Sequence, residues 1–548
     1  MTSRLSLPCR RAGLARLLAA YALVLAGVTV SPLIADSPAV GATTLSTGDV
    51  PWTGTWSVSP QSGGTSFNRQ TLRQVVHASI GGTSARVEVS NAFGSAPLAI
   101  ADVHVAQRSA GSTITAGTDH AVTFGGQAST TIPAGGLAVS DPVAFTVPAL
   151  SDVAISMYLP QSTGASTFHQ QGNATNYVAA GDVSGNTSLS GAQTNGSYYF
   201  LTGLDVQNSA AQGAVVTLGA SITDGVASGT DDNRRWPNDL ALRLANSGHP
   251  IGVLNQGISG NRLLVDGAGQ SALNRFDRDV LAQPGAQWVI FSDDPINDLG
   301  STSPPPTADQ LIAGAKQLVS RAHARGLKFL CSTLTPYQGA GYWTQQGETA
   351  REAFNAFVRG AGSGCDGVVD QDTATHDPAN PTRYLPAYDA GDHLHPNEAG
   401  LQAIANAVNL TLFGGPTTSV VSLRAHANGQ LVTADNAGAD PLIANRTAVG
   451  GWEEFDLIGN PDGSVSLRSH ANNNLVTADN AGAAPLIANR TSIGPSEEFD
   501  LINNSDGSAS LRAHANGHLV TADNAGANPL IANRTAIGPW EEFDVIHD

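Results

Sequence analysis

The chain has 548 residues, of which 41% are hydrophobic and 13% charged, and its formal net charge is -18. Because this length exceeds what one hydrophobic core usually serves, we expect about three folded domains. The apolar content is that of a globular protein and argues against a disordered tail or a coiled coil. The negative charge argues against nucleic acid and anionic membrane surfaces as partners, because both select basic faces, so neutral substrates fit better.

The first segment has the pattern of a targeting peptide. Four arginines, at positions 4, 10, 11 and 16, precede an apolar run over residues 17–30, and small residues follow at 40–42. We therefore expect a signal peptide over residues 1–42, and a secreted, extracellular protein. A membrane anchor is the alternative, but the run is short for a membrane span and no second apolar run of that length follows.

Residues 50–210 are rich in Gly, Ser and Thr and contain alternating apolar and polar runs, such as 85–89 and 153–158. Such runs predict strands with one face in water, and no stretch here has helical periodicity. A β-sandwich is therefore the expected architecture. Its histidines have no metal-ligand spacing, and we interpret them as surface or hydrogen-bonded residues: His77, His104, His120 and His169.

The middle section alternates short apolar strands with helical segments. Strands are predicted at 214–218, 251–254, 288–291, 329–330 and 368–369, and a capped amphipathic helix at 307–325, from Thr307 to a stop at Gly326. This alternation predicts a parallel sheet covered on both faces, and ligands of such sheets lie at the carboxyl ends of the strands.

Two segments of this section carry groups suited to nucleophilic catalysis. Residues 219–225 (GASITDG) place the hydroxyl of Ser221 at a glycine-flanked turn from strand to helix, although a serine there is often only a helix cap. Residues 392–397 (DHLHPN) precede a helix that begins near Glu398. A serine hydroxyl needs an imidazole to accept its proton and a carboxylate to orient that imidazole, roles that His395 and Asp392 fit.

Two further segments offer hydrogen-bond donors just after strands: 255–262 (NQGISGNR) and 294–298 (DPIND). Acyl transfer develops an oxyanion, which the backbone N–H groups of Gly260 and Ser221 and the amide of Asn297 would stabilise.

Ser, Gly, Asn and His in this order, each at a strand end, resemble the SGNH or GDSL hydrolase family over residues 213–413. The resemblance implies a three-layer, flavodoxin-like α/β domain at 211–413 that needs no cofactor or metal. It also implies the roles of the site residues: nucleophile Ser221, oxyanion donors Gly260 and Asn297, and base pair His395 with Asp392. The β domain before it is similar to the leader domain of a subgroup of secreted esterases.

Two residues depart from the family pattern. Ala220 stands where the family usually has aspartate, and Pro295 stands where glycine is usual. Proline fixes φ and removes a donor, so the loop that carries Asn297 is expected to shift if that glycine takes a conformation closed to proline. Neither change deletes a reacting group, so we expect an active enzyme, weakened at most.

A metal site at Asp392, His393 and His395 is the competing interpretation, because these residue types are common ligands. Further ligands in fitting places are missing, so no metal is expected.

Two cysteines remain after removal of the targeting segment that contains Cys9: Cys331 and Cys365. In an oxidising compartment they form either one disulfide or two separate buried thiols, and spacing does not decide between them.

The end of the chain repeats at an offset of 44 residues, with copies that open at 421–424 (VSLR), 465–468 (VSLR) and 509–512 (ASLR). Each copy holds four short strand patterns. This predicts a β-trefoil over residues 420–548, after a linker at 414–419, and the segment resembles the fascin-like trefoil modules. Trp452 and Trp540 are equivalent to Ser496 of the middle copy, and they either cap the barrel or form an aromatic platform for sugar.

These features predict a secreted serine esterase acting on an ester substrate, such as an acetylated polysaccharide held by the trefoil. The alternatives are a carbohydrate-binding protein with impaired catalysis, which Ala220 and Pro295 suggest, and a lipase-like esterase whose trefoil is a spacer.

Overall fold

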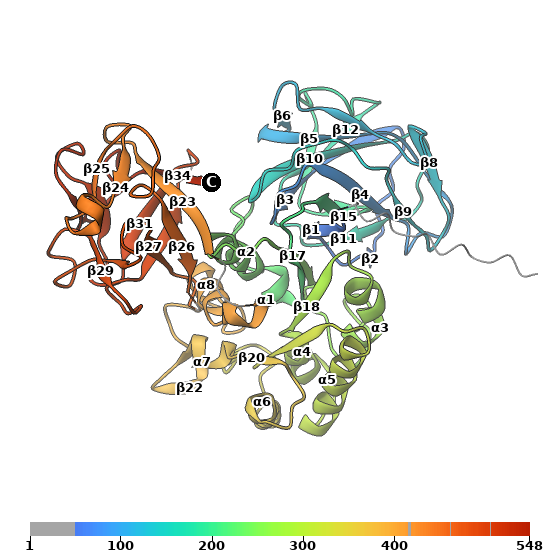
Figure 1. Ribbon diagram of the computed structural model, residues 1–548. Helices are drawn as coiled ribbons and strands as arrows, with labels where there is room; N and C mark the ends of the chain where they lie inside the picture. The colour runs from blue at the N-terminus through green and yellow to red at the C-terminus, as the bar shows by residue number, and fades with distance from the viewer. Residues whose placement is uncertain (1–49, 415–417, 461, 505, 548) are drawn as a thin grey trace, which may run out of the picture. The chain divides into compact units, whose positions relative to one another are not determined.

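The computed structural model describes residues 50–414, 418–460, 462–504 and 506–547 (Figure 1). The predicted signal peptide at 1–42 lies outside these residues. Within them, no helix has both the length and the apolar character needed to cross a membrane. Residues 50–548 form one compact unit with three large hydrophobic clusters, which follow one another along the chain.

Residues 50–207 form antiparallel sheets and, in this fully described segment, no helix. One sheet has four strands in the order β1-β15-β4-β9, a second has eight strands around β3, β10 and β5, and a third has three. Alternation decides which face is buried: in β4, Ala85, Val87 and Val89 point into the core between more exposed neighbours. The strands are β1 (Trp52–Ser57), β2 (Gln61–Ser62), β3 (Gln70–Ala78), β4 (Ser84–Ser90), β5 (Leu98–Ala110), β6 (Thr113–Ile114), β7 (His120–Val122), β8 (Ser129–Ile132), β9 (Leu137–Val139), β10 (Ser151–Leu159), β11 (Thr167–His169), β12 (Asn176–Ala180), β13 (Gln193–Asn195), β14 (Tyr198–Tyr199) and β15 (Leu201–Gln207).

The central section is an α/β domain with a five-stranded parallel sheet in the order β17-β16-β18-β19-β20. Its strands match the five predicted ones, and β16 is buried along its whole length, as expected for a sheet covered on both faces. The strands are β16 (Gly213–Gly219), β17 (Ile251–Gly257), β18 (Ala286–Phe291), β19 (Lys328–Ser332) and β20 (Gly367–Val369), with a small hairpin of β21 (His376–Asp377) and β22 (Asn380–Tyr384).

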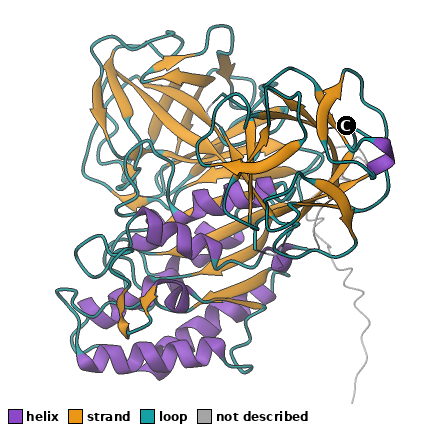
Figure 2. Cartoon of the chain, turned by 90° about the vertical axis from the view of Figure 1, so that its left-hand side faces the viewer, coloured by secondary structure: helices purple, strands orange, loops and turns teal. Residues whose placement is uncertain are grey.

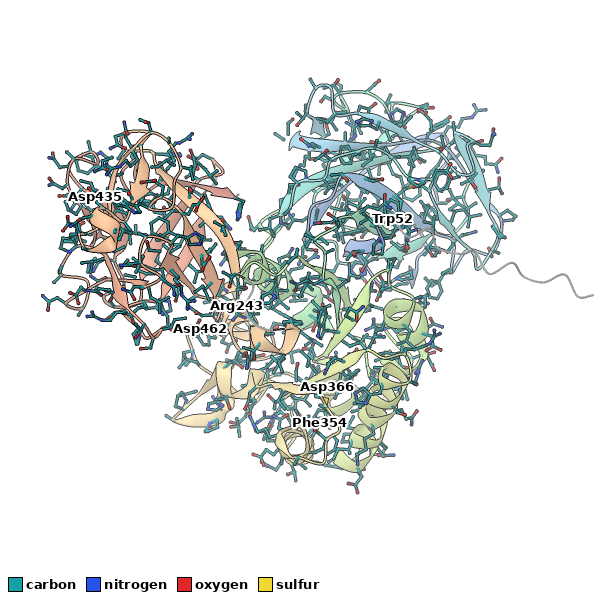
Figure 3. All side chains as sticks on the ribbon, viewed as in Figure 1. Trp52, Arg243, Phe354, Asp366, Asp435 and Asp462 are labelled. Atoms are coloured by element: carbon teal, nitrogen blue, oxygen red, sulfur yellow. A yellow bond between two sulfur atoms is a disulfide. The ribbon has the colours of Figure 1, made fainter. Side chains whose placement is uncertain are left out.

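Helices gather around this sheet, as Figure 2 shows in purple. The predicted cap of α5 is confirmed, since the Thr307 hydroxyl accepts the N–H of Gln310 in a capping box. Phe354 of α6 is fully buried in the domain core (Figure 3). The helices are α1 (Ser221–Asp224), α2 (Trp236–Asn246), α3 (Ala272–Phe276), α4 (Asp294–Ser301), α5 (Ala308–His323), α6 (Gln345–Arg359), α7 (Gln371–Thr375) and α8 (Glu398–Asn406), with a π-helical turn at Asp277–Leu281 and a 3-10 turn at Leu410–Phe413.

The strand order places a topological switch point at β16, because β17 lies on one side of it and β18 on the other. Parallel sheets of this kind bind ligands at the carboxyl end of such a strand. In this chain that end leads directly into Ser221.

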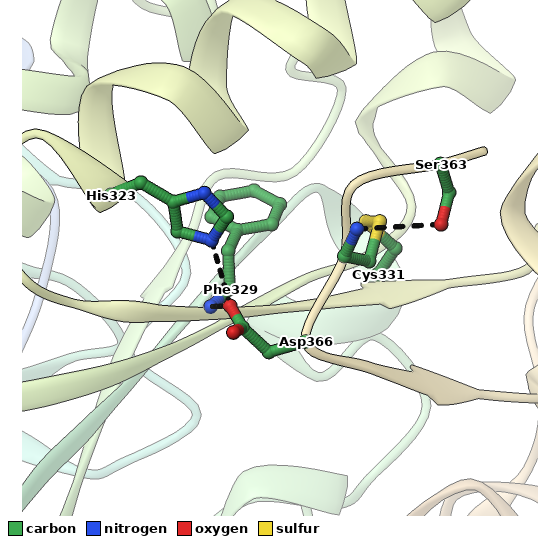
Figure 4. Close-up of a disulfide and its surroundings, with 6 residues drawn as sticks. His323, Phe329, Cys331, Ser363 and Asp366 are labelled. Carbon is green, nitrogen blue, oxygen red and sulfur yellow. Dashed lines mark hydrogen bonds and ion pairs between the residues drawn. A yellow bond between two sulfur atoms is a disulfide. The ribbon is translucent and has the colours of Figure 1, made fainter. Parts of the chain in front are cut away.

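A disulfide joins Cys331 of β19 to Cys365, just before β20 (Figure 4). The two strands are neighbours in the sheet, and the Cα atoms lie 5.8 Å apart, within the usual range for a disulfide. Of the two possibilities that the sequence left open, the structure has the disulfide.

Residues 418–547 form twelve strands, four for each 44-residue copy. Six of them close a ring in the order β23-β26-β27-β30-β31-β34, because β34 pairs with both β31 and β23. A hairpin branches from every second strand of the ring. The strands are β23 (Thr418–Ala425), β24 (Leu431–Thr433), β25 (Ile443–Arg446), β26 (Phe455–Gly459), β27 (Val465–Ser469), β28 (Leu475–Thr477), β29 (Ile487–Arg490), β30 (Phe499–Asn503), β31 (Ala509–Ala513), β32 (Leu519–Ala522), β33 (Leu530–Arg534) and β34 (Phe543–His547).

Backbone hydrogen bonds between three equivalent leucines join the copies to one another. The N–H of Leu442 donates to the carbonyl of Leu486, Leu486 donates to Leu530, and Leu530 donates back to Leu442, each at 2.8 Å. All three side chains are buried.

The first strand of this region begins at Thr418, two residues before the predicted boundary, since Thr418 already pairs with Ile458.

Candidate active site

Ser221 is the first residue of α1, directly after β16, and its side chain is only slightly exposed. Glycine is required on both sides of this turn. A Cβ at Gly219 would lie 2.1 Å from the Thr223 hydroxyl oxygen, and Gly225 ends the helix with a φ of 101°, in the left-handed region. The two glycines therefore allow the chain to leave the sheet abruptly while presenting Ser221 at its edge.

The segment before α8 brings His395 to this serine. Nε2 of His395 lies 2.9 Å from Oγ of Ser221, and its Nδ1 lies 2.6 Å from Oδ2 of Asp392. Asp392 also accepts the N–H groups of Leu394 at 3.0 Å and His395 at 2.9 Å. Partial burial would raise the pKa of Asp392, but the hydrogen bonds with His395 and Leu394 outweigh it and hold that pKa below its usual value. Asp392 is thus an anion that fixes the imidazole with Nε2 toward the serine.

His393 is turned to a different partner. It has a φ of 61°, and its Nδ1 contacts Asp389, whereas His395 contacts Asp392. The two histidines that a metal site would require therefore belong to separate hydrogen-bonded pairs.

Asn297 lies on α4, so the expectation of a loop here is wrong. Pro295 occupies the first turn of this helix, where no intrahelical partner for its missing N–H is needed and its fixed φ is helical. The Asn297 amide donates through Nδ2 to the carbonyl of Asn261 at 2.9 Å, and its Oδ1 accepts the hydroxyl of Tyr342 at 3.1 Å. These contacts orient the amide and leave one N–H of Nδ2 for another acceptor.

Gly260 lies in the turn after β17 and is exposed, with a φ of 79°. The next residue, Asn261, is the one that accepts from Asn297, so this turn and α4 are hydrogen-bonded to each other. Two predicted oxyanion donors are thereby brought into one corner of the domain, and Ser221, His395 and Asp392 are joined in one hydrogen-bonded series.

Several residues that support this corner are not among those predicted from the sequence. Asp293, which follows β18, accepts hydrogen bonds from the serine turn, and Tyr342 orients Asn297. The polar run 292–294 directly after a predicted strand was a signal for the first; no local pattern marks the second.

Arg275 is another such residue, and it is fully buried. Its guanidinium donates to the carbonyl of Gly219 at 3.0 Å, to Oδ1 of Asn261 at 3.1 Å and to the hydroxyl of Ser59 at 2.8 Å. Asp294 lies 3.4 Å away, and its burial raises its pKa to about 7, despite the opposing effect of Arg275. One cation therefore connects the strand before the serine, the Gly260 turn and the leading β region.

His169, one of the four histidines interpreted as surface or hydrogen-bonded residues, is buried and hydrogen-bonded in a second connection of this kind. Its Nε2 lies 3.1 Å from Oδ1 of Asp224, and its Nδ1 lies 3.0 Å from the carbonyl of Ser59. The other oxygen of Asp224 accepts both the N–H and the hydroxyl of Ser259, at 2.8 and 2.7 Å. Since Ser259 precedes Gly260, the leading β region reaches the candidate oxyanion donor.

Residue groups that could hold a metal ion lie elsewhere in the described part of the chain. Two exposed or half-buried sets in the C-terminal copies have ligand atoms within 4.8 Å of one another: His426 with Asp506 and Glu542, and His514 with Asp462 and Glu498. Neither set contains a residue of the predicted site.

Comparison with solved structures gives only weak global likenesses. A putative lipolytic protein of the G-D-S-L family from Desulfitobacterium hafniense DCB-2 is 22% identical, covering 35% of this chain and 96% of its own, with a TM-score of 0.28. A mutant of Axe2, an acetyl-xylooligosaccharide esterase from Geobacillus, is 22% identical, with coverages of 37% and 95% and a TM-score of 0.29. The designed 3-fold symmetric protein ThreeFoil is 19% identical, with coverages of 23% and 97% and a TM-score of 0.22.

No curated protein matches the chain. Residues 217–403, however, match the GDSL-like Lipase/Acylhydrolase family, and this range contains the serine turn, the Gly260 turn, α4 and the His395 segment. Residues 217–403 are therefore a GDSL-like acylhydrolase domain, and the protein that carries it is an ester hydrolase.

Proposed function

We propose that the protein is a secreted serine esterase in which Ser221 is the nucleophile, His395 the general base and Asp392 the residue that orients His395. The observation that carries this proposal is the unbroken series of hydrogen bonds from Asp392 through His395 to Ser221, at 2.6 and 2.9 Å. Both distances are those of a nucleophile and base in reach of each other.

The proposed reaction follows from these contacts. His395 accepts the hydroxyl proton as Ser221 Oγ attacks the ester carbonyl, and the resulting imidazolium is stabilised by Asp392. The oxyanion is bound by the N–H groups of Ser221 and Gly260 and by Nδ2 of Asn297. Collapse releases the alcohol, which takes the proton from His395, and water then hydrolyses the acyl-serine by the same route.

The position of Pro295 supports an active enzyme over one that has lost catalysis. Proline is favoured in the first turn of a helix, and Asn297 two residues later keeps both its orienting contacts. Proline at position 295, in place of the glycine usual in the resembled family, therefore leaves the amide donor of Asn297 in place.

The rest of the chain is consistent with an exported, polysaccharide-directed esterase. We propose that residues 50–210 form a β-sandwich and that residues 420–548 form a β-trefoil which holds an acylated polysaccharide near the enzyme. The disulfide favours an oxidising compartment. Trp452 and Trp540 are 40% and 36% exposed, which favours an aromatic platform over the alternative of packed caps.

Hydrolysis of p-nitrophenyl acetate by the wild type and by Ser221→Ala tests the chemistry, with acetate release from acetylated xylan measured in parallel. We expect turnover that disappears in Ser221→Ala, together with acetate release from the polymer. Turnover that persists in Ser221→Ala would refute the proposed nucleophile, and release from small esters alone would refute the polysaccharide substrate.

The trefoil part of the proposal has its own test in the tryptophan positions. Trp452→Ala and Trp540→Ala should each weaken retention on insoluble xylan severalfold, whereas Ser496→Ala, at the equivalent site of the middle copy, should not change it. Equal retention by all three variants would contradict an aromatic sugar platform.

A further inference from the structure

The backbone turn that carries Ser221 is held by a carboxylate from a neighbouring strand. Asp293 follows β18, which pairs with β16, so the carboxyl ends of the two strands are adjacent. Oδ1 of Asp293 accepts the N–H of Ala220 at 3.0 Å, and Oδ2 accepts the N–H of Ile222 at 2.8 Å. One carboxylate thus binds the backbone on both sides of the nucleophile.

A third donor completes this contact. The hydroxyl of Thr223 donates to Oδ1 of Asp293 at 2.6 Å, and Asp293 is only 2% exposed. Hydrogen bonds to an ionised acceptor are shorter and stronger than neutral ones, and more so where water is excluded. Asp293 is also the cap residue of α4, yet its side chain makes no bond to that helix. Its carboxylate therefore bonds to the serine turn and not to α4.

The sequence around the turn is adapted to this approach. A Cβ at Gly219 would lie 2.1 Å from the Thr223 hydroxyl oxygen and 2.5 Å from Oδ1 of Asp293, so any larger residue there would disturb the hydrogen bond between them. Position 220, where the resembled family usually has an aspartate, is alanine in this chain. Among the described residues, the carboxylate bound to the N–H groups that flank Ser221 is the one at 293.

We propose that Asp293 is the positioning residue of the nucleophile turn, supplying from the turn after β18 the carboxylate that Ala220 does not supply. It fixes Ser221 through the N–H groups of the two adjacent residues and through Thr223. The N–H of Ser221 is not among its donors, which agrees with the role proposed for that N–H in binding the oxyanion. This inference rests on the proposed function, since it concerns the geometry of the serine nucleophile.

Asp293→Asn is the direct test, because it keeps the shape of the side chain but replaces one acceptor oxygen with a donor that faces N–H or O–H groups. Misplacement of a nucleophile by about 1 Å costs on the order of 100-fold in rate. We expect kcat for p-nitrophenyl acetate to fall about 10- to 100-fold, with KM changed less than about twofold. Reaction with a fluorophosphonate probe should slow by a similar factor. Gly219→Ala, which disturbs the bond of Thr223 to the same carboxylate, should reproduce this pattern.

The control is Asp205→Asn, which removes an equally buried carboxylate that binds Arg86 in the leading β region. It should lower the melting temperature without lowering kcat. A kcat of Asp293→Asn within twofold of the wild type would overturn the inference, and so would an equal loss of kcat in both variants at equal loss of stability. Failure of the proposed function looks different, because the wild type itself would then not react with the probe in a Ser221-dependent way.

Discussion

Single residues decide whether the hydrogen-bonded series at the edge of the sheet can transfer a proton. Ser221, His395 and Asp392 depend on one another, because each side chain is oriented by the next. We predict that His395→Ala lowers kcat as much as Ser221→Ala, roughly 10,000-fold or more, and that Asp392→Ala costs less. Steady-state kinetics on p-nitrophenyl acetate measure this, and a His395→Ala variant that retains most of the rate would exclude His395 as the base.

Tyr342 acts on the same reaction through Asn297. Burial raises the pKa of Tyr342, so its hydroxyl stays a neutral donor to Oδ1 of Asn297. Tyr342→Phe should lower kcat about 3- to 10-fold with little change in KM, because the amide is needed mainly for the oxyanion. The matched control is Tyr337→Phe, which removes a buried hydroxyl without a hydrogen-bond partner in the described structure. Equal effects of the two substitutions would argue against an orienting role.

Asp294 makes the free energy of unfolding depend on pH. Burial raises its pKa in the folded state to about 7, compared with about 3.9 when the chain is unfolded. Its contribution to stability is therefore complete below pH 4 and is lost as pH rises toward 7, since the unfolded chain ionises first. Asp294→Asn should gain stability relative to the wild type as pH rises from 4 to 7, measured by urea unfolding. A difference that is constant over this range would contradict the raised pKa.

The sequence reveals the residues whose roles depend on local patterns, and not those whose partners come from elsewhere in the chain. Ser221 and His395 stand in short motifs at strand and helix boundaries, which can be recognised before the fold is known. Asp293, Tyr342 and His169 gain their roles from partners 45 to 73 residues distant, well beyond a local window. The separation from His169 to Asp224 is 55 residues.

At the level of secondary structure, the five parallel strands and the cap of α5 were predictable because each has a clear apolar period or a capping pattern. Helix α4 was missed because Pro295 resembles the start of a loop as much as the first turn of a helix. The difference is important for the site, because a helix holds Asn297 more firmly than a loop would.

The connection from β11 to the turn after β17 can be tested at His169. His169→Ala should destabilise the protein by about 1–3 kcal/mol, because a buried oxygen of Asp224 loses its partner. It should also lower kcat severalfold, because Asp224 holds Ser259 beside Gly260. His120→Ala, at a half-buried histidine of β7, is the comparison for both melting temperature and kcat. Unchanged kcat in His169→Ala would show that the contact of His169 with Asp224 does not influence the site.

For the molecule as a whole, the repeat at 44 residues made the C-terminal strands predictable, whereas the contacts of the leading β region with the catalytic domain were not predictable. The repeat specifies twelve strands by simple counting, and the structure has them. Arg275 and Ser59, by contrast, are 216 residues apart and follow no pattern in the sequence.

Leu486→Ala tests how the three copies share their stability. The cavity should cost about 2–5 kcal/mol, and the transition of residues 418–547 should shift down as one unit because Leu486 is buried in a hydrophobic cluster formed by all three copies. Differential scanning calorimetry measures the shift, with kcat for small esters expected to stay unchanged. The exposed Leu137 gives the control, since Leu137→Ala opens no cavity. A shift confined to part of the C-terminal region would contradict shared stability.

The pairing of β23 with β34, which closes the ring of six strands, has a consequence for how the C-terminal region can fold. β23 finds a ring neighbour in β34, which is made more than 100 residues later. Until the third copy is present, the first one therefore has an open edge and apolar side chains without their final cover. The catalytic domain, whose sheet is complete by residue 369, has no such delay. A chain that lacks its third copy thus carries an unfinished ring of strands beside a complete parallel sheet, and the open edge of β23 is where it is most exposed to pairing with another chain.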